Sequence, residues 1–290
     1  MTMTGRTRVT GVFGWPVSHS LSPVFQNAAF EALGLDFVYV PFAVRPEDLP
    51  SAVSGIRALG IAGVNLTIPH KESALALLDE VDEEARLAGA VNTINNSDGT
   101  LRGTTTDGRG FIRSLREDGR FEPSGRTALV LGAGGAARSI CAALVKEGVG
   151  ALYIWNRTTR RGQLLVGHLR SALGCQRVYE ADSDRLNDAA FWKEIDLLVN
   201  ATSAGMRQGD ASPAPASRLH RGIFVYDIVY NRFTALLAAA RRAGCRFLDG
   251  SSMLVYQGAV SFEIWTGRAA PVEAMKRALA AATAESWQDG

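Results

Sequence analysis

A lysine and an aspartate are the two residues of this chain best placed to move a proton. Lys71 lies in GVNLTIPHKES and Asp107 in TTTDGRG, each between an apolar run and a helical pattern. We expect Pro69 to begin a helix, which would put the cationic Lys71 in a first turn where the helix dipole favours anions. Such a breach of a local rule is typical of functional sites. The pattern predicts a Lys71–Asp107 pair for proton transfer, although a surface lysine and a helix-capping aspartate are the alternatives.

Two serines flank a single leucine in GWPVSHSLSP, just before another helical pattern. Ser22 followed by Pro23 is typical of a helix N-cap with proline at the first helical position. Capping accounts for Ser22 but leaves Ser20, two residues earlier, without a role.

A glycine-rich turn lies in the second half of the chain, in LVLGAGGAARS. Gly132, Gly134 and Gly135 separate an apolar run from a helical pattern, and Ala137 occupies the last small position of the dinucleotide fingerprint. Glycines permit the tight turn and let backbone N–H groups approach a pyrophosphate at the helix N-terminus. A tight strand-to-helix turn without a ligand is the alternative, but both flanking elements are present, so we predict a dinucleotide site.

The end of the next apolar run, ALYIWNRTTRR, indicates which dinucleotide binds. An NAD site usually has Asp or Glu there to bind the ribose 2′-hydroxyl. Here Asn156, Arg157 and Thr158 take that place, with Arg160 and Arg161 behind them. A guanidinium suits a 2′-phosphate through charge-assisted hydrogen bonds, so the sequence favours NADP over NAD. A solvated basic loop is the alternative.

The elements that must position these residues alternate between strand-like runs and helical patterns, which is typical of an α/β fold. In the first half, strands are expected at 8–14, 36–44 and 61–68, and helices at 23–34, 46–60 and 69–81. The rhythm restarts at Thr127, with strands at 127–134, 151–157, 196–202, 222–230 and 246–250 and helices at 136–148, 160–173 and 234–245. Two further helices are expected near 253–266 and 272–282, and 182–191 is read as a surface loop.

The overall composition limits the classes of function. The chain has 290 residues, 31 Lys and Arg against 29 Asp and Glu, and 47% hydrophobic residues. This balance gives no sign of nucleic-acid or membrane partners, and no run approaches the ~20 apolar residues of a membrane span. The N-terminus lacks the apolar core of a secretory signal. Three distant cysteines and four scattered histidines predict neither a disulfide framework nor a metal site, and they suit the reducing cytoplasm.

These motifs together resemble those of the shikimate dehydrogenase family from about Val12 to Trp265. The matching motifs occur in the family's order and at its spacing, and they are SHSLSP, NLTIPHK, GAVNT, TDG, GAGGAA, NRT and MLVYQGA. Seven short motifs in one order are far more specific than any one of them.

The resemblance implies a role for each matching position. Ser20 and Ser22 would bind the substrate carboxylate, because hydroxyl donors beside a helix N-terminus can form a small anion site. Lys71 would be the acid/base residue with Asp107 as its partner. The ring hydroxyls would be held by Thr67, Asn92, Asp107 and Gln257, with Tyr230 on the substrate side. The NADP site would be lined by Gly132, Ala133, Gly134, Gly135, Ala136, Asn156, Arg157, Thr158, Arg161, Ile228 and Gly250.

The resemblance also implies the fold and the reaction. An α/β substrate-binding domain, residues 1–107, would precede a Rossmann NADP-binding domain, residues 108–250, and helices in 251–290 would return to the first domain. NADPH would reduce 3-dehydroshikimate to shikimate reversibly in a cleft between the domains, without a metal. A cytoplasmic monomer or homodimer that binds only small molecules would follow.

Three positions depart from the family pattern and leave the substrate open. Thr105 replaces the usual asparagine before Thr-Asp-Gly, and Gln26 stands where histidine is common. The link Arg232-Phe233-Thr234 lacks the usual proline and is a residue shorter. A quinate/shikimate or aminoshikimate dehydrogenase is therefore an alternative, although Ser22 favours shikimate because quinate-preferring relatives often carry threonine there. A catalytically silent ligand-binding protein is a second alternative, which the presence of both Lys71 and Asp107 disfavours.

Overall fold

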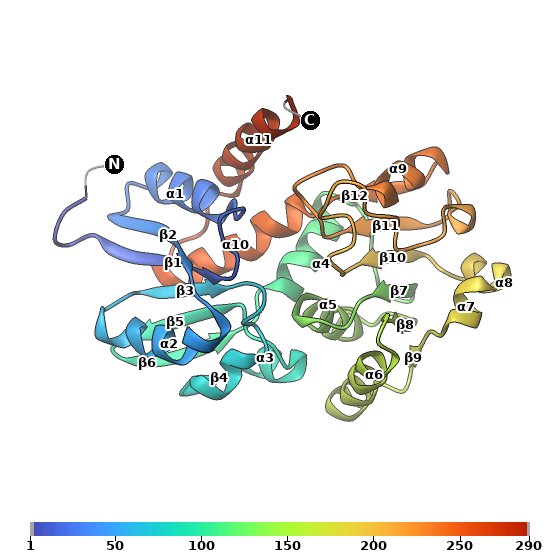
Figure 1. Ribbon diagram of the computed structural model, residues 1–290, viewed down its shortest axis with the longest axis horizontal. Helices are drawn as coiled ribbons and strands as arrows, with labels where there is room; N and C mark the ends of the chain where they lie inside the picture. Colours follow the sequence, from blue (N-terminus) through green and yellow to red (C-terminus); the bar gives the residue numbers. More distant parts are fainter. Residues whose placement is uncertain (1–2, 289–290) are drawn as a thin grey trace. The chain divides into compact units, whose positions relative to one another are not determined.

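The computed structural model describes residues 3–288, which form two compact units. The first unit runs as far as Gly110 and resumes at Leu254, and the second is Phe111–Met253. The chain passes from one unit to the other inside helices α4 (Asp107–Glu117) and α10 (Ser251–Thr266). Figure 1 labels these elements along the chain. No helix within residues 3–288 combines the length and the apolar character needed to cross a membrane.

The first unit is built on a mixed six-stranded sheet in the order β2-β1-β3-β5-β6-β4. Strands β1, β2 and β3 are parallel, β5 is antiparallel to both β3 and β6, and β4 is parallel to β6. The carboxyl ends of β1, β3 and β6 and the start of β5 therefore meet at one edge. The strands are β1 (Arg8–Gly14), β2 (Phe37–Ala43), β3 (Gly63–Leu66), β4 (Glu80–Val81), β5 (Thr93–Ser97) and β6 (Thr100–Thr104).

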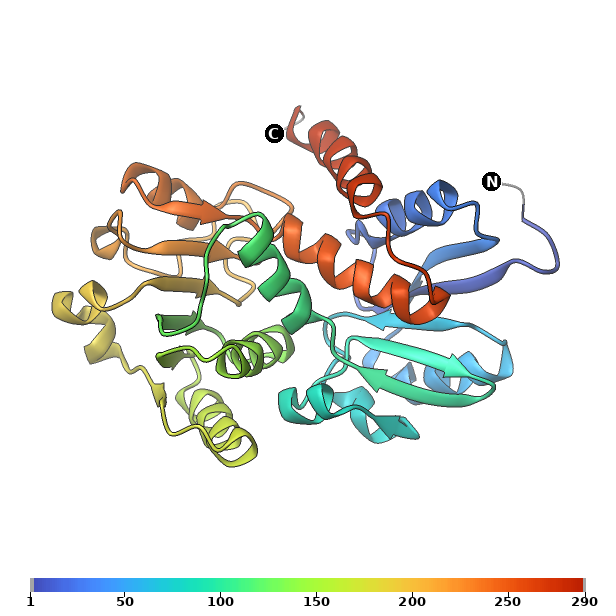
Figure 2. The same ribbon diagram turned by 180° about the vertical axis from the view of Figure 1, so that it is seen from behind.

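Helices cover both faces of this sheet, because each face has its own apolar cluster. One cluster joins β1 and β2 to α1 (Ser22–Ala32), α10 and α11 (Val272–Gln288), and Phe30 stacks between Phe37 and Phe262 with centroid distances of 5.1 Å to each. Figure 2 shows α11 packed beside α1. The expected return of the C-terminal helices to the first unit is thus confirmed. The other cluster joins the sheet to α2 (Leu49–Ala58), α3 (Glu83–Ala88) and the 3₁₀ turn η2 (Ser73–Leu77); a second 3₁₀ turn, η1 (Pro46–Asp48), precedes α2.

The second unit is a six-stranded parallel sheet in the order β12-β11-β10-β7-β8-β9. The chain starts at β7 in the middle and winds outward in both directions, which defines a doubly wound sheet with a switch point between β7 and β10. The strands are β7 (Thr127–Leu131), β8 (Ala151–Trp155), β9 (Val178–Glu180), β10 (Leu197–Asn200), β11 (Phe224–Asp227) and β12 (Arg246–Leu248).

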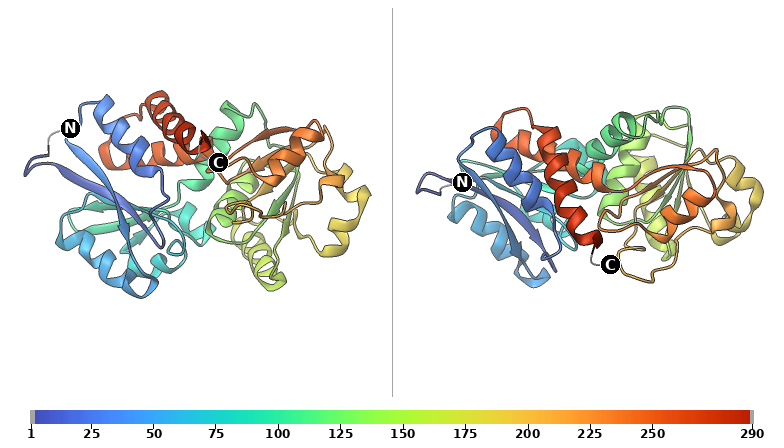
Figure 3. Two further views of the ribbon diagram at one scale, coloured as in Figure 1. Left: turned by 45° about the horizontal axis from the view of Figure 1, so that its top comes forward. Right: turned by 90° about the horizontal axis from the view of Figure 1, so that it is seen from above.

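Its helices again lie on both faces, as the views in Figure 3 show. Residues of α4, α5 (Gly135–Lys146) and α6 (Thr159–Leu173) share one apolar cluster, and residues of α8 (Ala189–Lys193) and α9 (Ala235–Arg242) share the other. Helix α7 (Ser183–Asn187) and the 3₁₀ turn η3 (Ala216–Arg218) complete the unit. The mixed α/β class predicted from the strand rhythm is confirmed.

Two of the secondary-structure elements expected from the sequence are wrong. The helix expected over 69–81 is replaced by a turn, η2 and strand β4, because the Lys71 carbonyl accepts a hydrogen bond from the Val91 amide at 2.8 Å and is therefore taken up by a tertiary contact. The loop expected over 182–191 contains α7 and α8. Their N-caps, Asp182 and Asp188, accept hydrogen bonds from backbone amides through their carboxylates.

Candidate active site

Lys71 and Asp107 form an ion pair in the first unit. The Lys71 ammonium contacts the Asp107 carboxylate, and the two side chains are 17% and 5% exposed. Lys71 follows β3 and Asp107 follows β6, so both come from the edge at which the carboxyl ends of these strands meet. Next to Lys71, the buried His70 ring contacts the Val44 carbonyl at 2.8 Å, which fixes the turn. The predicted pair is therefore present and largely shielded from water.

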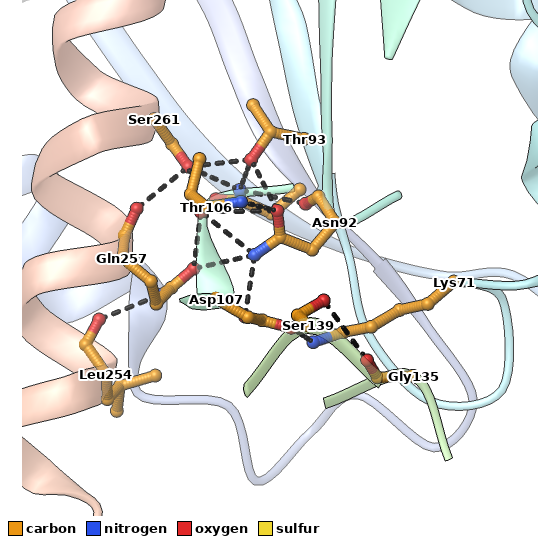
Figure 4. A network of polar contacts seen from close by, with 11 residues as sticks. Lys71, Asn92, Thr93, Thr106, Asp107, Gly135, Ser139, Leu254, Gln257 and Ser261 are labelled. Atoms are coloured by element: carbon orange, nitrogen blue, oxygen red, sulfur yellow. Dashed lines mark hydrogen bonds and ion pairs between the residues drawn. The ribbon is translucent and has the colours of Figure 1, made fainter. Parts of the chain in front are cut away.

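Asn92 holds the second oxygen of the Asp107 carboxylate. Its amide nitrogen donates to Asp107 Oδ1 at 2.7 Å, while its amide oxygen accepts from the Thr106 backbone at 2.7 Å (Figure 4). Gln257, on α10, accepts from the same Asn92 nitrogen at 3.3 Å. Both oxygens of Asp107 are thus occupied, one by a cation and one by an amide, so the carboxylate cannot rotate away from Lys71.

A second layer of buried polar groups lies behind Asn92. The Asn65 amide nitrogen donates to the Asn92 carbonyl at 3.1 Å, to Thr93 Oγ1 at 3.0 Å and to Ser261 Oγ at 2.9 Å. Tyr39 Oη donates to Asn65 Oδ1 at 2.8 Å. Neither Asn65 nor Tyr39 was predicted from the sequence as a site residue. The available signal was an asparagine inside β3, a strand whose four residues are all buried.

The structure corrects the capping interpretation of Ser22. Helix α1 has Leu21 as its N-cap, with no side-chain capping bond, and Ser22 is already its first residue. The Ser22 amide donates weakly to Ser20 Oγ at 3.4 Å. Burial raises the pKa of Tyr39, whose hydroxyl donates to Asn65.

Thr67 lies at the end of β3, against the end of β1. A side chain at Gly14 would collide with the Thr67 methyl group, so glycine is required there. Thr67 is half-buried and its amide donates to the Phe13 carbonyl at 2.9 Å. Ser20, Ser22, Thr67, Lys71, Asn92, Asp107 and Gln257 accordingly all belong to the first unit.

The glycine turn of the second unit fits a dinucleotide. Gly132 has φ of +118°, and a Cβ there would lie 2.7 Å from the Ala201 carbonyl oxygen, so only glycine suits this position. Gly134 is the N-cap of α5 with no side-chain capping bond, and a Cβ built on it meets nothing within 4 Å. The space beside Gly134 is therefore open where α5 begins, as a pyrophosphate at a helix N-terminus requires.

A polar hollow of about 470 Å³ lies beside the end of β8. Arg157 is exposed at its rim, and Asn156 Nδ2 donates to the Thr158 carbonyl at 2.9 Å, which shapes the turn into α6. The lining residues are Trp155, Asn156, Arg157, Thr159, Glu180, Ala181, Asp182, Ser183 and Asp184. Glu180, Asp182 and Asp184 also line this hollow. The sequence did not predict them there, because it did not predict that strand β9 pairs with β8.

Ile228, Tyr230 and Gly250 lie close together at the carboxyl end of β11. A side chain at Gly250 would collide with the Ile228 carbonyl, and the Gly250 amide donates to the Val229 carbonyl at 3.1 Å. Tyr230 is half-buried, and this burial raises the pKa of its phenol. All three are in the second unit with the glycine turn.

No group of three or more His, Cys, Asp or Glu side chains within residues 3–288 is arranged to hold a metal ion. The three cysteines are free thiols.

Three family models match successive parts of the chain. Residues 12–94 match the shikimate dehydrogenase substrate binding domain, residues 118–230 match the shikimate/quinate 5-dehydrogenase model, and residues 250–280 match the shikimate 5′-dehydrogenase C-terminal domain.

Whole-chain comparisons agree with these matches. A shikimate dehydrogenase (NADP(+)) of Geobacter metallireducens is 50% identical over 283 residues, which cover 97% of this chain and 99% of that protein. The crystal structure of shikimate 5-dehydrogenase from Thermus thermophilus with NADP(H) and shikimate has a TM-score of 0.85 at 38% identity and covers 95% of this chain and 99% of that one. A quinate dehydrogenase from Corynebacterium glutamicum in complex with NAD has a TM-score of 0.86 at 32% identity, covering 95% and 99%.

Proposed function

The chain belongs to the shikimate dehydrogenase family, and we propose that it is an NADP-dependent shikimate dehydrogenase that reduces 3-dehydroshikimate reversibly to shikimate. The observation that carries this proposal is the shielded Lys71–Asp107 pair with Asn92 on its second oxygen. The reaction would serve the shikimate pathway, which leads to chorismate and the aromatic amino acids.

Lys71 would supply and receive the proton at the reacting oxygen. A carbonyl that accepts hydride develops negative charge on its oxygen, and an ammonium placed there stabilises that charge and then donates a proton. Asp107 keeps the ammonium at one position, because its own carboxylate is held by Asn92 at 2.7 Å. The pair is largely shielded from water, which strengthens both interactions.

The substrate's other groups would be held by the remaining first-unit residues. The Ser20 and Ser22 hydroxyls at the start of α1 suit a carboxylate, because they are hydrogen-bond donors beside the positive end of the helix dipole. Thr67, Asn92, Asp107 and Gln257 offer the mixture of donors and acceptors that ring hydroxyls need. Tyr230 is also proposed to contact the substrate.

NADP, when bound, supplies the hydride. The amides of Ala133, Gly134, Gly135 and Ala136 would hold its pyrophosphate, since α5 begins there uncapped. Gly132 would line the site through its tight turn, because its own amide donates to the Trp155 carbonyl at 2.7 Å. Arg157 and Arg161, with Asn156 and Thr158, would bind the 2′-phosphate, and Ile228 and Gly250 would lie beside the nicotinamide. We further propose a cytoplasmic monomer or homodimer with small molecules as its ligands.

A quinate/shikimate or aminoshikimate dehydrogenase is the second candidate. Thr105 and the shortened Arg232-Phe233-Thr234 link favour it, because both depart from the family pattern. The likeness to a quinate dehydrogenase that was solved with NAD supports keeping it.

Initial rates decide between these functions. The purified protein should be assayed with shikimate and with quinate, each with NADP⁺ and with NAD⁺. We expect the highest kcat/KM with shikimate and NADP⁺. If kcat/KM is instead highest with quinate and NAD⁺, the proposal is wrong and the second candidate takes its place. Tight NADPH binding without turnover of either ring substrate would indicate a binding protein.

A further inference from the structure

Asp227 is a buried carboxylate that the proposed proton transfer does not use. It is the last residue of β11 and its side chain has no exposed surface. It accepts hydrogen bonds from Thr234 Oγ1 at 2.6 Å, Asn200 Nδ2 at 2.9 Å and the Val229 amide at 3.1 Å. Each of these donors is uncharged. A buried carboxylate without a cationic partner is unfavourable, so its retention points to a specific task.

The hydrogen bond to Thr234 closes the segment Ile228–Phe233. Thr234 is also the N-cap of α9, where its hydroxyl oxygen accepts from the Leu237 amide at 3.2 Å. The Val229 bond fixes the other end of the segment, next to Asp227 itself. One carboxylate thus sets both ends of the segment that carries Ile228 and Tyr230.

Asn200 connects Asp227 to the neighbouring loop. Asn200 ends β10, and its amide nitrogen donates to the Ala204 carbonyl at 3.0 Å as well as to Asp227. Its amide oxygen accepts from the Thr202 amide at 3.1 Å and from the Thr202 hydroxyl at 2.7 Å. The loop after β10 and the segment after β11 therefore share one buried pair of side chains.

Two glycines bring these turns into direct contact. Gly205, with φ of +101°, approaches Thr234 so closely that a Cβ there would lie 2.9 Å from the Thr234 methyl carbon. Gly132 of the dinucleotide turn packs in the same way on Ala201. All of these turns follow parallel strands at their carboxyl ends, where doubly wound sheets bind their ligands.

The shortened link that follows Tyr230 is anchored by an aromatic side chain. The Phe233 ring contacts the Phe247 ring edge-on with centroids 5.9 Å apart, and the Arg241 guanidinium lies over it at 4.9 Å. Phe233 therefore ties the link to β12 and α9, which compensates for the missing proline. The segment has little freedom as long as Thr234 stays bound to Asp227.

We propose that Asp227 is a positioning residue for the dehydrogenase reaction, which holds the Ile228–Tyr230 segment in its working place through Thr234, Val229 and Asn200. The inference rests on the proposed function, because it takes Ile228 and Tyr230 to be ligand-facing. Loss of the Asp227–Thr234 bond would release the segment. The adenosine end of NADP, held by the glycine turn and the residues at 156–161, would be unaffected.

A matched pair of variants at Thr234 tests this. Thr234→Val keeps the shape of the side chain and removes the hydroxyl, whereas Thr234→Ser keeps the hydroxyl. At a temperature where all forms are folded, we expect Thr234→Val to lower kcat/KM for shikimate by roughly tenfold or more, the size of one hydrogen bond to a charged group. We expect Thr234→Ser to stay within about twofold and to rescue the loss, and the Kd for NADPH to be similar in all forms.

Limited trypsin digestion supplies a readout that does not depend on turnover. Arg232 lies inside the segment Ile228–Phe233. Release of this segment should therefore make trypsin cleave after Arg232 faster in Thr234→Val than in Thr234→Ser. If kcat/KM or this cleavage is the same in the two variants and only the Tm differs, the role of Asp227 is structural and the proposal is wrong.

Asp227→Asn gives the same test should Thr234→Val fail to fold. Its amide oxygen can still accept from Val229 and Asn200, but its nitrogen donates, so the Thr234 hydroxyl hydrogen loses its acceptor. We expect a fall in kcat/KM and faster cleavage after Arg232, and an unchanged value of either contradicts the proposal. If the wild type itself turns over neither ring substrate, the proposed function fails, while the digestion still decides whether Asp227 holds the segment.

Discussion

The polar network around Lys71 and Asp107 in the first unit and the edge of the second unit at which β7 and β8 end, where we propose that the cofactor binds, are built in opposite ways. Around Asp107 the polar side chains are buried and bonded to one another, with Lys71 on one carboxylate oxygen and Asn92 on the other. At the cofactor edge Arg157 is exposed, and helices α5 and α6 begin without a side-chain cap. In the first region the polar groups are hydrogen-bonded to one another. In the second, a guanidinium and the N-termini of two helices are left for a ligand.

The difference matches the two tasks proposed for them. Proton transfer needs groups held in place before the substrate arrives, since misplacement lowers the rate directly. Binding an anionic cofactor needs donors and positive charge that are not already used. Substitutions in the first region should therefore change mainly kcat, and those in the second should change mainly cofactor affinity.

The largest effect is expected for Lys71→Ala. Loss of a positioned acid/base group lowers kcat by about two to four orders of magnitude. Binding of shikimate should change much less, because its carboxylate and ring hydroxyls have other partners. Steady-state kinetics and shikimate titration measure the two quantities. Lys193→Ala, at an exposed lysine of the second unit, is the control. An unchanged kcat would remove Lys71 from the mechanism and with it the contrast between the regions.

Asp227 is the buried carboxylate of the second unit that can be compared with Asp107 in the first. Asp107 is paired with the Lys71 ammonium, whereas Asp227 accepts hydrogen bonds from uncharged donors. Burial raises the pKa of Asp227 to about 6 from 3.8, and the nearby Asp249 carboxylate adds to the rise. The folded state then binds more protons than the unfolded state between these values. The contribution of this group to stability is therefore fully present below about pH 4 and is lost as the pH rises through about 6.

The measurement is the free energy of unfolding of the wild type and of Asp227→Asn across pH 4 to about 7. A shift of about two pH units corresponds to roughly 3 kcal/mol, so the difference between the two proteins should change by up to that amount. We expect the wild type to lose stability relative to Asp227→Asn as the pH rises. Parallel curves would mean that Asp227 has an ordinary pKa and that a partner balances its charge.

Arg157→Ala tests the proposed cofactor site of the second unit. A guanidinium bound to a phosphate contributes about 1.5–3 kcal/mol, so the Kd for NADPH should rise by roughly tenfold or more while that for NADH changes little. Added salt should weaken NADPH binding by the wild type more than by the variant, because exposed charges are screened. Arg177→Ala, at another exposed arginine of the same unit, is the control. Equal losses for both cofactors would contradict a 2′-phosphate contact.

The sequence predicted the glycine turn of the second unit correctly, but it predicted the buried polar network of the first unit only in part. The glycine turn could be predicted because the strand, the glycines and the helix are adjacent in the chain. The turn that carries Lys71 was misread as a helix, because its carbonyl bonds to Val91, a partner 20 residues away that no local pattern reveals. Asn65 and Tyr39 were missed for the same reason, since what marks them is burial among partners brought together only by the sheet.

The smallest effects are expected for substitutions at two helix N-caps, one that stabilises the fold and one that we propose binds the cofactor. Asp82 caps α3 by accepting from the Ala85 amide at 2.8 Å, whereas Thr158 at the start of α6 makes no side-chain capping bond. Asp82→Ala should therefore lower the free energy of unfolding by about 1 kcal/mol for the lost N-cap, with the Kd for NADPH unchanged. A further loss is expected because the buried Thr104 hydroxyl donates to the same carboxylate and would lose its acceptor. Thermal or denaturant unfolding and NADPH titration measure these quantities.

Thr158→Ala should show the reverse pattern. Since its hydroxyl caps nothing in the absence of cofactor, its removal should leave the free energy of unfolding within about 0.5 kcal/mol, the range of surface substitutions. Binding of NADPH should weaken severalfold, because a donor beside the 2′-phosphate is lost. If Thr158→Ala instead destabilises the free protein as much as Asp82→Ala does, the uncapped start of α6 is not reserved for the cofactor. The two regions would then differ only in exposure, and the exposed charge of Arg157 alone would have to account for the preference for NADPH.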